Sequence, residues 1–115
     1  MPRPFNIIIA GEGGQGVLSM AKIMAIAAWS SGKTSVYVPY FSTEKRGGLS
    51  MSYARIGDAP IPYPKFAKAD LWVALSQRAV GRIFDYLDDR TVAIVNSTLV
   101  TDTSRIAKWN PERVD

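Results

Sequence analysis

The chain has 115 residues, which is enough for one domain that buries about two-thirds of its unfolded surface on folding. Apolar residues make up 47% and charged residues 21%, and this balance argues against extensive disorder. The absence of cysteine and histidine excludes disulfides, thiolate nucleophiles and cysteine-bound clusters from this sequence, and removes the commonest catalytic base. The net charge of +4 is dispersed and too mild to predict nucleic-acid binding; an anionic ligand or an acidic protein partner suits it equally well.

The first predicted element is a strand over residues 5–10. It contains three consecutive β-branched residues, Ile7 to Ile9, as is typical of a strand covered on both faces. The apolar run is far too short to span a membrane, and although an Arg precedes it as in a signal peptide, it is short and leads straight into the glycine turn. We therefore expect a cytoplasmic protein.

The glycine turn that follows reads Gly11-Glu12-Gly13-Gly14-Gln15-Gly16. Gly11, Gly13 and Gly16 have the spacing of a turn that brings a ligand close to backbone N–H groups at the start of a helix. The positive end of that helix favours an anion such as phosphate. The alternative is that the glycines only allow the helix to pack closely on its strand.

A helix is predicted from Val17 to Ser31, with Gly32 as its left-handed cap. Its apolar residues occupy nearly the whole circumference, so it must be covered on more than one side. One face is expected on the sheet, and the other implies a second layer or a partner subunit.

The second strand is predicted over residues 34–40, with Pro39 placing it toward an edge of the sheet. A dinucleotide site of the ordinary kind needs an acidic residue at the end of this strand, to bind the ribose hydroxyls. The strand contains none, and the nearest acid is Glu44 in the next loop. This argues against an ordinary nicotinamide site.

The next segment is a polar loop that contains Glu44, Lys45, Arg46, Gly47, Gly48 and Ser50. In open α/β sheets the carboxyl ends of the strands carry the ligand crevice, so these residues are candidates for it. The alternative is a solvated surface loop.

Three further strands are predicted over residues 51–56, 71–75 and 91–95, with a helix over 78–87 that Ser76 and Gln77 cap. The three prolines of residues 59–65 predict an extended connection. The remaining residues predict only a short irregular element that Asn110-Pro111 ends. Five strands with two clear helices would leave one face of the sheet poorly covered, so we expect the chain to be a fragment or to need a partner.

Two motifs carry a family resemblance. The first reads Gly11-Glu12-Gly13-Gly14-Gln15-Gly16-Val17, and the second reads Glu44-Lys45-Arg46-Gly47-Gly48-Leu49-Ser50. Two shorter segments, Arg55-Ile56 and Ala69-Asp70-Leu71, add to the resemblance. In this order they resemble the gamma subunit, or gamma domain, of the 2-oxoacid:acceptor oxidoreductases, the relatives of pyruvate:ferredoxin oxidoreductase that include indolepyruvate and phenylglyoxylate enzymes. The resemblance covers about residues 5–97.

The resemblance implies a Rossmann-like three-layer α/β domain with a mostly parallel sheet of about five strands. The family's domain is usually longer, at about 180 residues, so residues 1–115 would form one gamma-type domain that lacks its C-terminal helical part. The family oxidatively decarboxylates a 2-oxoacid with thiamine diphosphate, passes electrons through iron–sulfur clusters, and in most members transfers the acyl group to coenzyme A. Thiamine and the clusters are expected on partner subunits, the thiamine-binding alpha and beta chains and a ferredoxin-like delta chain, and no cofactor is expected on this chain alone.

The expected site is non-catalytic and contains no metal. Its predicted cofactor-binding, anion-binding or interface residues are Gly11, Gly13, Gly14, Gln15, Gly16, Glu44, Arg46, Gly47, Gly48 and Ser50. We expect the glycine amides and the planar Arg46 guanidinium to bind a phosphate or carboxylate. Three roles are open for Glu44: it orients Arg46, acts across a subunit interface, or forms only a surface ion pair of small net value. The resemblance implies that the gamma domain packs beside the thiamine site and contacts coenzyme A or substrate. The alternatives are a stand-alone nucleotide-binding or dinucleotide-binding Rossmann module and a pure interaction scaffold.

Overall fold

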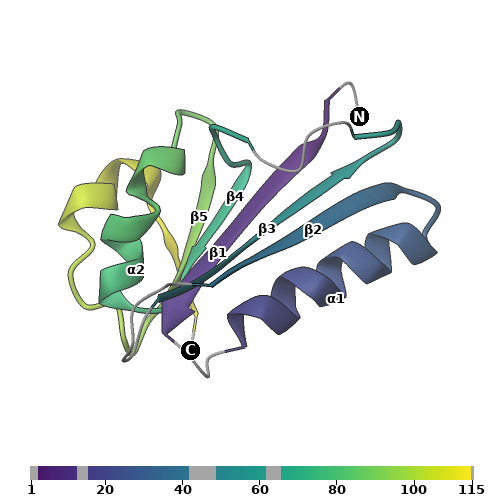
Figure 1. Cartoon of the computed structure of the whole chain (residues 1–115). Coiled ribbons are helices and arrows are strands. Elements are labelled where there is room, and N and C mark those ends of the chain that lie inside the picture. The colour runs from purple at the N-terminus through teal and green to yellow at the C-terminus, as the bar shows by residue number, and fades with distance from the viewer. Residues whose placement is uncertain (1–2, 13–15, 42–48, 62–65, 115) are drawn as a thin grey trace.

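A six-stranded sheet organises the computed structural model, which describes residues 3–12, 16–41, 49–61 and 66–114 (Figure 1). Its strands are β1 (Phe5–Glu12), β2 (Thr34–Phe41), β3 (Leu49–Gly57), β4 (Leu71–Ala74), β5 (Val92–Asn96) and β6 (Glu112–Val114). They lie in the order β2-β3-β1-β4-β5-β6. Only β3 runs antiparallel to its neighbours, so the sheet is mostly parallel, as predicted.

Helices lie on both faces of this sheet, which gives the predicted three layers. Figure 1 shows α1 (Val17–Ser30) beside β2 and β3 on one face, and α2 (Gln77–Arg82) on the other. The 3₁₀ turns η1 (Phe84–Tyr86) and η2 (Ser104–Trp109) lie on the α2 side. From β1 the chain passes to one edge of the sheet and from β4 to the other, so right-handed crossovers place α1 and α2 on opposite faces. None of the helices in the described ranges is long and apolar enough to cross a membrane.

The central strand β1 is buried on both of its faces, as its run of isoleucines predicts. Ile8 joins the core under α2, together with the fully buried Trp72. Ile7 and Ile9 join the second core under α1. Because side chains alternate across a strand, these three residues of β1 contribute to the apolar cores on both faces of the sheet.

Part of the α1 face of the sheet is uncovered. An apolar groove of about 550 Å³ lies between α1 and the strands β4 to β6, with Met20, Met24, Leu71, Val73, Ile94 and Val114 in its lining. On the outer surface of α1, Ile23 is 66% exposed and Trp29 is 71% exposed. The shortage of helices in the sequence predicted this incomplete cover.

Four expectations differ from the structure. The sheet has six strands, not five, because the exposed residues of β6 pair with β5 without any apolar alternation in the sequence. Gly11 and Glu12 extend β1 instead of opening the turn, because they pair with Ser50 and Leu49 of β3.

The helix predicted over residues 78–87 ends at Arg82 and is followed by η1. Gly81 is a weak helix former near its end, and the Ile83 carbonyl accepts hydrogen bonds from the Trp72 indole and the Tyr86 amide. The third strand is also longer than predicted, at residues 49–57, because it pairs along the whole of both neighbours. Pro39 does lie on an edge strand, β2, as predicted.

Candidate functional site

The two sequence motifs flank the same end of the sheet. Gly11, at the end of β1, pairs with Ser50, at the start of β3, and Ser50 also pairs with Phe41, where β2 ends. The backbones that lead into both loops therefore meet at the carboxyl end of β1, which we call the rim. The other predicted site residues lie outside the described residues: Gly13, Gly14, Gln15, Glu44, Arg46, Gly47 and Gly48.

Helix α1 begins at the rim with Gly16 in a left-handed conformation, at φ 79°. This backbone angle favours glycine over residues that carry a Cβ atom. The N-cap residue, Gly16, has no side chain that could cap the helix, and the first helical turn contains no acidic residue. Its first amides and its positive end are therefore directed to the rim without a neutralising carboxylate from the helix itself.

A hollow of about 210 Å³ lies at this point of the rim. Glu12, Gly16, Val17, Leu18, Ser19 and Ser50 line it. We call this feature the rim hollow. Its size suits one phosphate or carboxylate group with water, because each water molecule occupies about 30 Å³ of liquid volume.

A buried hydrogen bond holds the start of α1 on the sheet. Ser52 of β3 is fully buried, and its hydroxyl donates to the Val17 carbonyl over 2.9 Å. Ser52 lies opposite Ile9 of β1. The position of the helix start thus depends on β3, the strand that follows the second motif.

A charged cluster that the sequence analysis missed lies beside the rim. Glu12 accepts hydrogen bonds from the Ser76 hydroxyl, over 2.8 Å, and from the Arg78 guanidinium, with which it forms an ion pair. Ser76 also caps α2, because its Oγ accepts from the Ala79 amide. The Arg78 guanidinium is the main reason that the pKa of Glu12 lies below its ordinary value, against the opposing effect of burial.

These residues are 64 and 66 positions apart in the sequence, and only the neighbouring positions of β1 and β4 bring them together. The connections from β1 and β4 leave toward opposite edges of the sheet, so the cluster lies at a topological switch point. Ligands of open α/β sheets bind at such points. The sequence analysis did not use this rule, because the rule locates the cluster only once the strand order is known.

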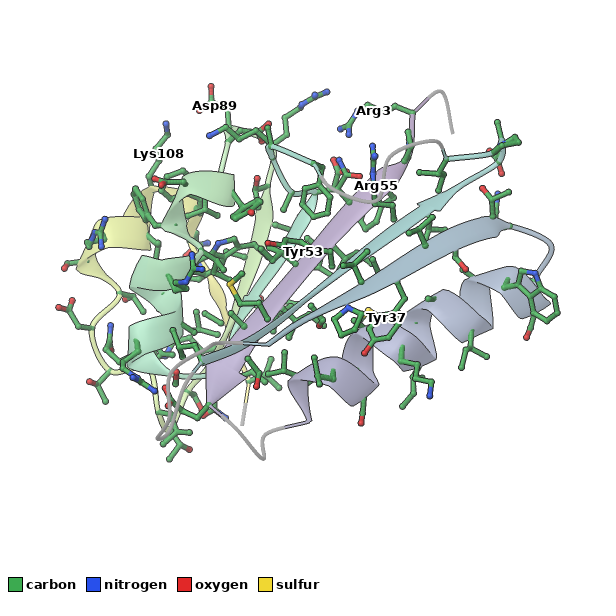
Figure 2. The ribbon with its side chains drawn as sticks, in the orientation of Figure 1. Arg3, Tyr37, Tyr53, Arg55, Asp89 and Lys108 are labelled. Atoms are coloured by element: carbon green, nitrogen blue, oxygen red, sulfur yellow. The ribbon has the colours of Figure 1, made fainter. Side chains whose placement is uncertain are left out.

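Arg3 and Arg55 lie at the opposite end of the sheet from the rim (Figure 2), and both have structural partners. Arg3 forms an ion pair with Asp70, at 2.6 Å, and hydrogen bonding to that carboxylate raises the pKa of Arg3. Arg55 donates to the Asn6 side chain over 2.8 Å and lies near the Phe66 ring. Arg55, which contributes to the family resemblance, therefore binds groups far from the rim.

No metal centre is evident in the described part of the chain. Those residues contain no group of three or more acidic side chains that could hold an ion. Among the described residues that line the rim hollow, Glu12 is the one that bears a carboxylate. These residues offer backbone amides and hydroxyls, with the Glu12–Arg78 ion pair beside the hollow.

Comparisons with known proteins identify the family of this chain. The family model described as pyruvate ferredoxin/flavodoxin oxidoreductase matches residues 6–115. The 2-oxoglutarate synthase subunit KorC of Archaeoglobus fulgidus is 35% identical over 100 residues, which cover 87% of this chain and 54% of that protein. The pyruvate synthase subunit PorC of Methanothermobacter marburgensis is 38% identical over 102 residues, which cover 85% of this chain and 56% of that protein.

A solved structure supports the same relationship. The gamma subunit of a keto/oxoacid ferredoxin oxidoreductase from Geobacter sulfurreducens superposes with a TM-score of 0.73 at 35% sequence identity. The superposition covers 86% of this chain and 54% of that subunit. This chain thus spans a little over half the length of these relatives, and it belongs to the pyruvate ferredoxin/flavodoxin oxidoreductase family.

Proposed function

We propose that the chain acts as a gamma-type subunit, or part of one, in a multisubunit 2-oxoacid:ferredoxin oxidoreductase. The observation that carries this proposal is the family match over residues 6–115. The KorC and PorC relatives are subunits of a 2-oxoglutarate synthase and a pyruvate synthase, so the substrate class is a 2-oxoacid. The reaction is oxidative decarboxylation with thiamine diphosphate, iron–sulfur clusters and, in most members, coenzyme A, all held or bound with partner subunits.

In this proposal the rim faces the thiamine-bearing partner and positions an anionic group of coenzyme A or substrate. The first-turn amides of α1, beginning after Gly16, donate hydrogen bonds to that group, and the helix dipole favours its charge. Arg46 supplies a planar fork for a carboxylate or phosphate, and Glu44 orients it. These residues bind and orient; bond breaking takes place on groups of the partner subunits.

The apolar surface of the chain supports the partner requirement. The groove between α1 and the strands β4 to β6 is lined mainly by apolar side chains, and Trp29 is largely exposed on the same helix. Exposed apolar area of this kind is characteristic of an interaction site. We therefore propose that a partner polypeptide covers this apolar surface in the working assembly.

Purification of the tagged chain from its native cells tests this function. The proposal expects thiamine-bearing and cluster-bearing subunits to co-purify, with 2-oxoacid-dependent reduction of ferredoxin in the eluate. A stable lone monomer with turnover of its own would contradict it. Within the assembly, Arg46→Ala should lower activity without reducing subunit recovery, and unchanged activity at limiting coenzyme A would remove Arg46 from the site.

A separate preparation of the chain alone tests the runner-up function, a stand-alone nucleotide-binding module. Calorimetry of the isolated chain with NAD, NADP and coenzyme A should give no dinucleotide binding if the subunit proposal is correct. The second strand, Thr34–Phe41, contains no acid for the ribose hydroxyls. Tight NAD or NADP binding would favour the runner-up.

A further inference from the structure

The rim hollow presents an electrostatic conflict. The proposed function places an anion against the first-turn amides of α1, yet Glu12 lines the same hollow. A carboxylate close to a bound anion repels it, and two unit charges about 8–10 Å apart near a protein surface change affinity by roughly 15- to 35-fold. The local structure must therefore deal with the charge of Glu12 if the hollow is to bind an anion.

The direction of the Glu12 side chain and its partners resolve this conflict. Side chains alternate along β1, so Glu12 points to the same side of the sheet as Ile8 and Ala10, which belong to the core under α2. Ser50 and the start of α1 lie toward the other face. The carboxylate is thus turned from the hollow toward α2.

Two residues of the α2 segment hold it there. The Ser76 hydroxyl donates to Oε2, and the Arg78 guanidinium donates through Nε and a terminal nitrogen to both carboxylate oxygens. A planar two-point contact of this kind fixes the direction of the carboxylate as well as balancing its charge. The pair is partly shielded from water, with Glu12 31% and Arg78 51% exposed at their side chains.

We infer that Arg78 is a positioning residue that allows the rim hollow to bind anions, because it neutralises Glu12 and holds its carboxylate on the α2 side of the sheet. This inference rests on the proposed function, in which the hollow receives an anionic group. Arg78 itself does not contact the bound anion. The first-turn amides of α1 do so.

Amide NMR titration of the 115-residue chain with inorganic pyrophosphate at low ionic strength tests the inference. In the wild type, resonances of Gly16 to Ser19 should shift. Arg78→Ala should weaken pyrophosphate binding by roughly 15- to 35-fold, since it removes the cation that forms the ion pair with Glu12. Arg78→Lys should retain most of the affinity, and Arg82→Ala, four residues further along α2, serves as the matched loss of one positive charge.

The decisive variant combines Arg78→Ala with Glu12→Gln. If Arg78 acts through Glu12, the double variant regains the wild-type affinity, and Glu12→Gln alone binds at least as well as wild type. If Arg78 contacts the anion, the double variant remains as weak as Arg78→Ala, which overturns the inference. Equal weakening by Arg82→Ala also overturns it, because the effect would then reflect overall charge.

The outcomes separate this inference from the proposed function. Pyrophosphate binding that does not respond to Arg78→Ala refutes the inference and leaves the anion-binding rim intact. Absence of pyrophosphate shifts at Gly16 to Ser19 in the wild type refutes the anion-binding rim and the inference with it. Thermal unfolding of each variant shows whether weaker binding reflects loss of the fold. The double variant also lacks the ion pair, so it controls for any destabilisation that comes from losing that pair.

Discussion

The start of α1 provides the sharpest test of how the backbone builds the rim. Gly16 is the residue before the helix and has φ 79°, a conformation that residues with a Cβ atom adopt only at a cost. A Cβ atom added at this position has no heavy atom of the described residues within 4 Å, so Gly16→Ala introduces no clash with them. We therefore expect the effect of the substitution to come from backbone strain.

The expected size of this effect follows from the conformation alone. An alanine in the left-handed region costs about 1–2 kcal/mol. For a chain of 115 residues, 1 kcal/mol lowers the unfolding temperature by about 4 °C, so Gly16→Ala should melt about 4–8 °C below wild type. Gly16→Asn should recover part of the loss, because asparagine tolerates this region.

Gly32 supplies a matched control at the other end of the same helix. It also has a positive φ, 90°, and a Cβ atom added there likewise has no heavy atom within 4 Å in the part of the chain that the structure describes. Gly32→Ala should lower the melting temperature by a similar amount, as followed by circular dichroism. In the assembled enzyme, however, only Gly16→Ala should lower activity at matched fractions of folded protein. A Gly16→Ala chain as stable as wild type would refute the strain argument, and equal activity losses in the two variants would refute a special role for the rim.

Three further predictions follow from side-chain contacts. Trp72→Phe should cost about 2 kcal/mol in urea unfolding, because Trp72 is fully buried and its indole donates to the Ile83 carbonyl; a cost below about 0.5 kcal/mol would show that neither matters. Ser52→Ala should cost about 1 kcal/mol and speed hydrogen exchange in the first turn of α1, since the Ser52 hydroxyl binds the Val17 carbonyl; unchanged exchange there would argue against this anchor. The lowered pKa of Glu12 means that its ion pair stabilises the fold above the ordinary value of 4.5 and is lost as the pH falls below it. The stability difference between wild type and Arg78→Ala should therefore shrink from pH 6 to pH 3, and a constant difference would contradict the assignment.

The layers of the fold follow from local patterns in the sequence. Ile7 to Ile9 predicted a strand buried on both faces, and Pro39 predicted an edge position, because these signals act over a few residues. The left-handed cap at Gly32 is likewise a local property. Each of these features was predicted correctly.

Features that depend on tertiary pairing were not predicted. β6 consists of three exposed residues, whose sequence carries no strand pattern, and it exists because β5 offers an edge. The early end of α2 depends on Trp72 of β4, whose indole donates a hydrogen bond to the Ile83 carbonyl. The partnership of Glu12 with Arg78 depends on β4 lying next to β1, and no spacing rule within either segment reveals that order.

The predicted site residues fall into two groups, those that the structure describes and those outside the described residues. Gly11, Gly16 and Ser50 meet at the rim because register pairing and the helix start bring them together. The loop residues Glu44 and Arg46 lie outside the described residues, so their part in the site stays a prediction.

A structure of the native assembly, determined with thiamine diphosphate bound, tests the central claim most directly. The account predicts that the carboxyl end of β1, with Glu12, Gly16 and Ser50, faces the thiamine-bearing subunit. An assembly in which the opposite end of the sheet, with Arg3 and Asp70, faces that subunit while the rim is exposed to solvent would contradict it.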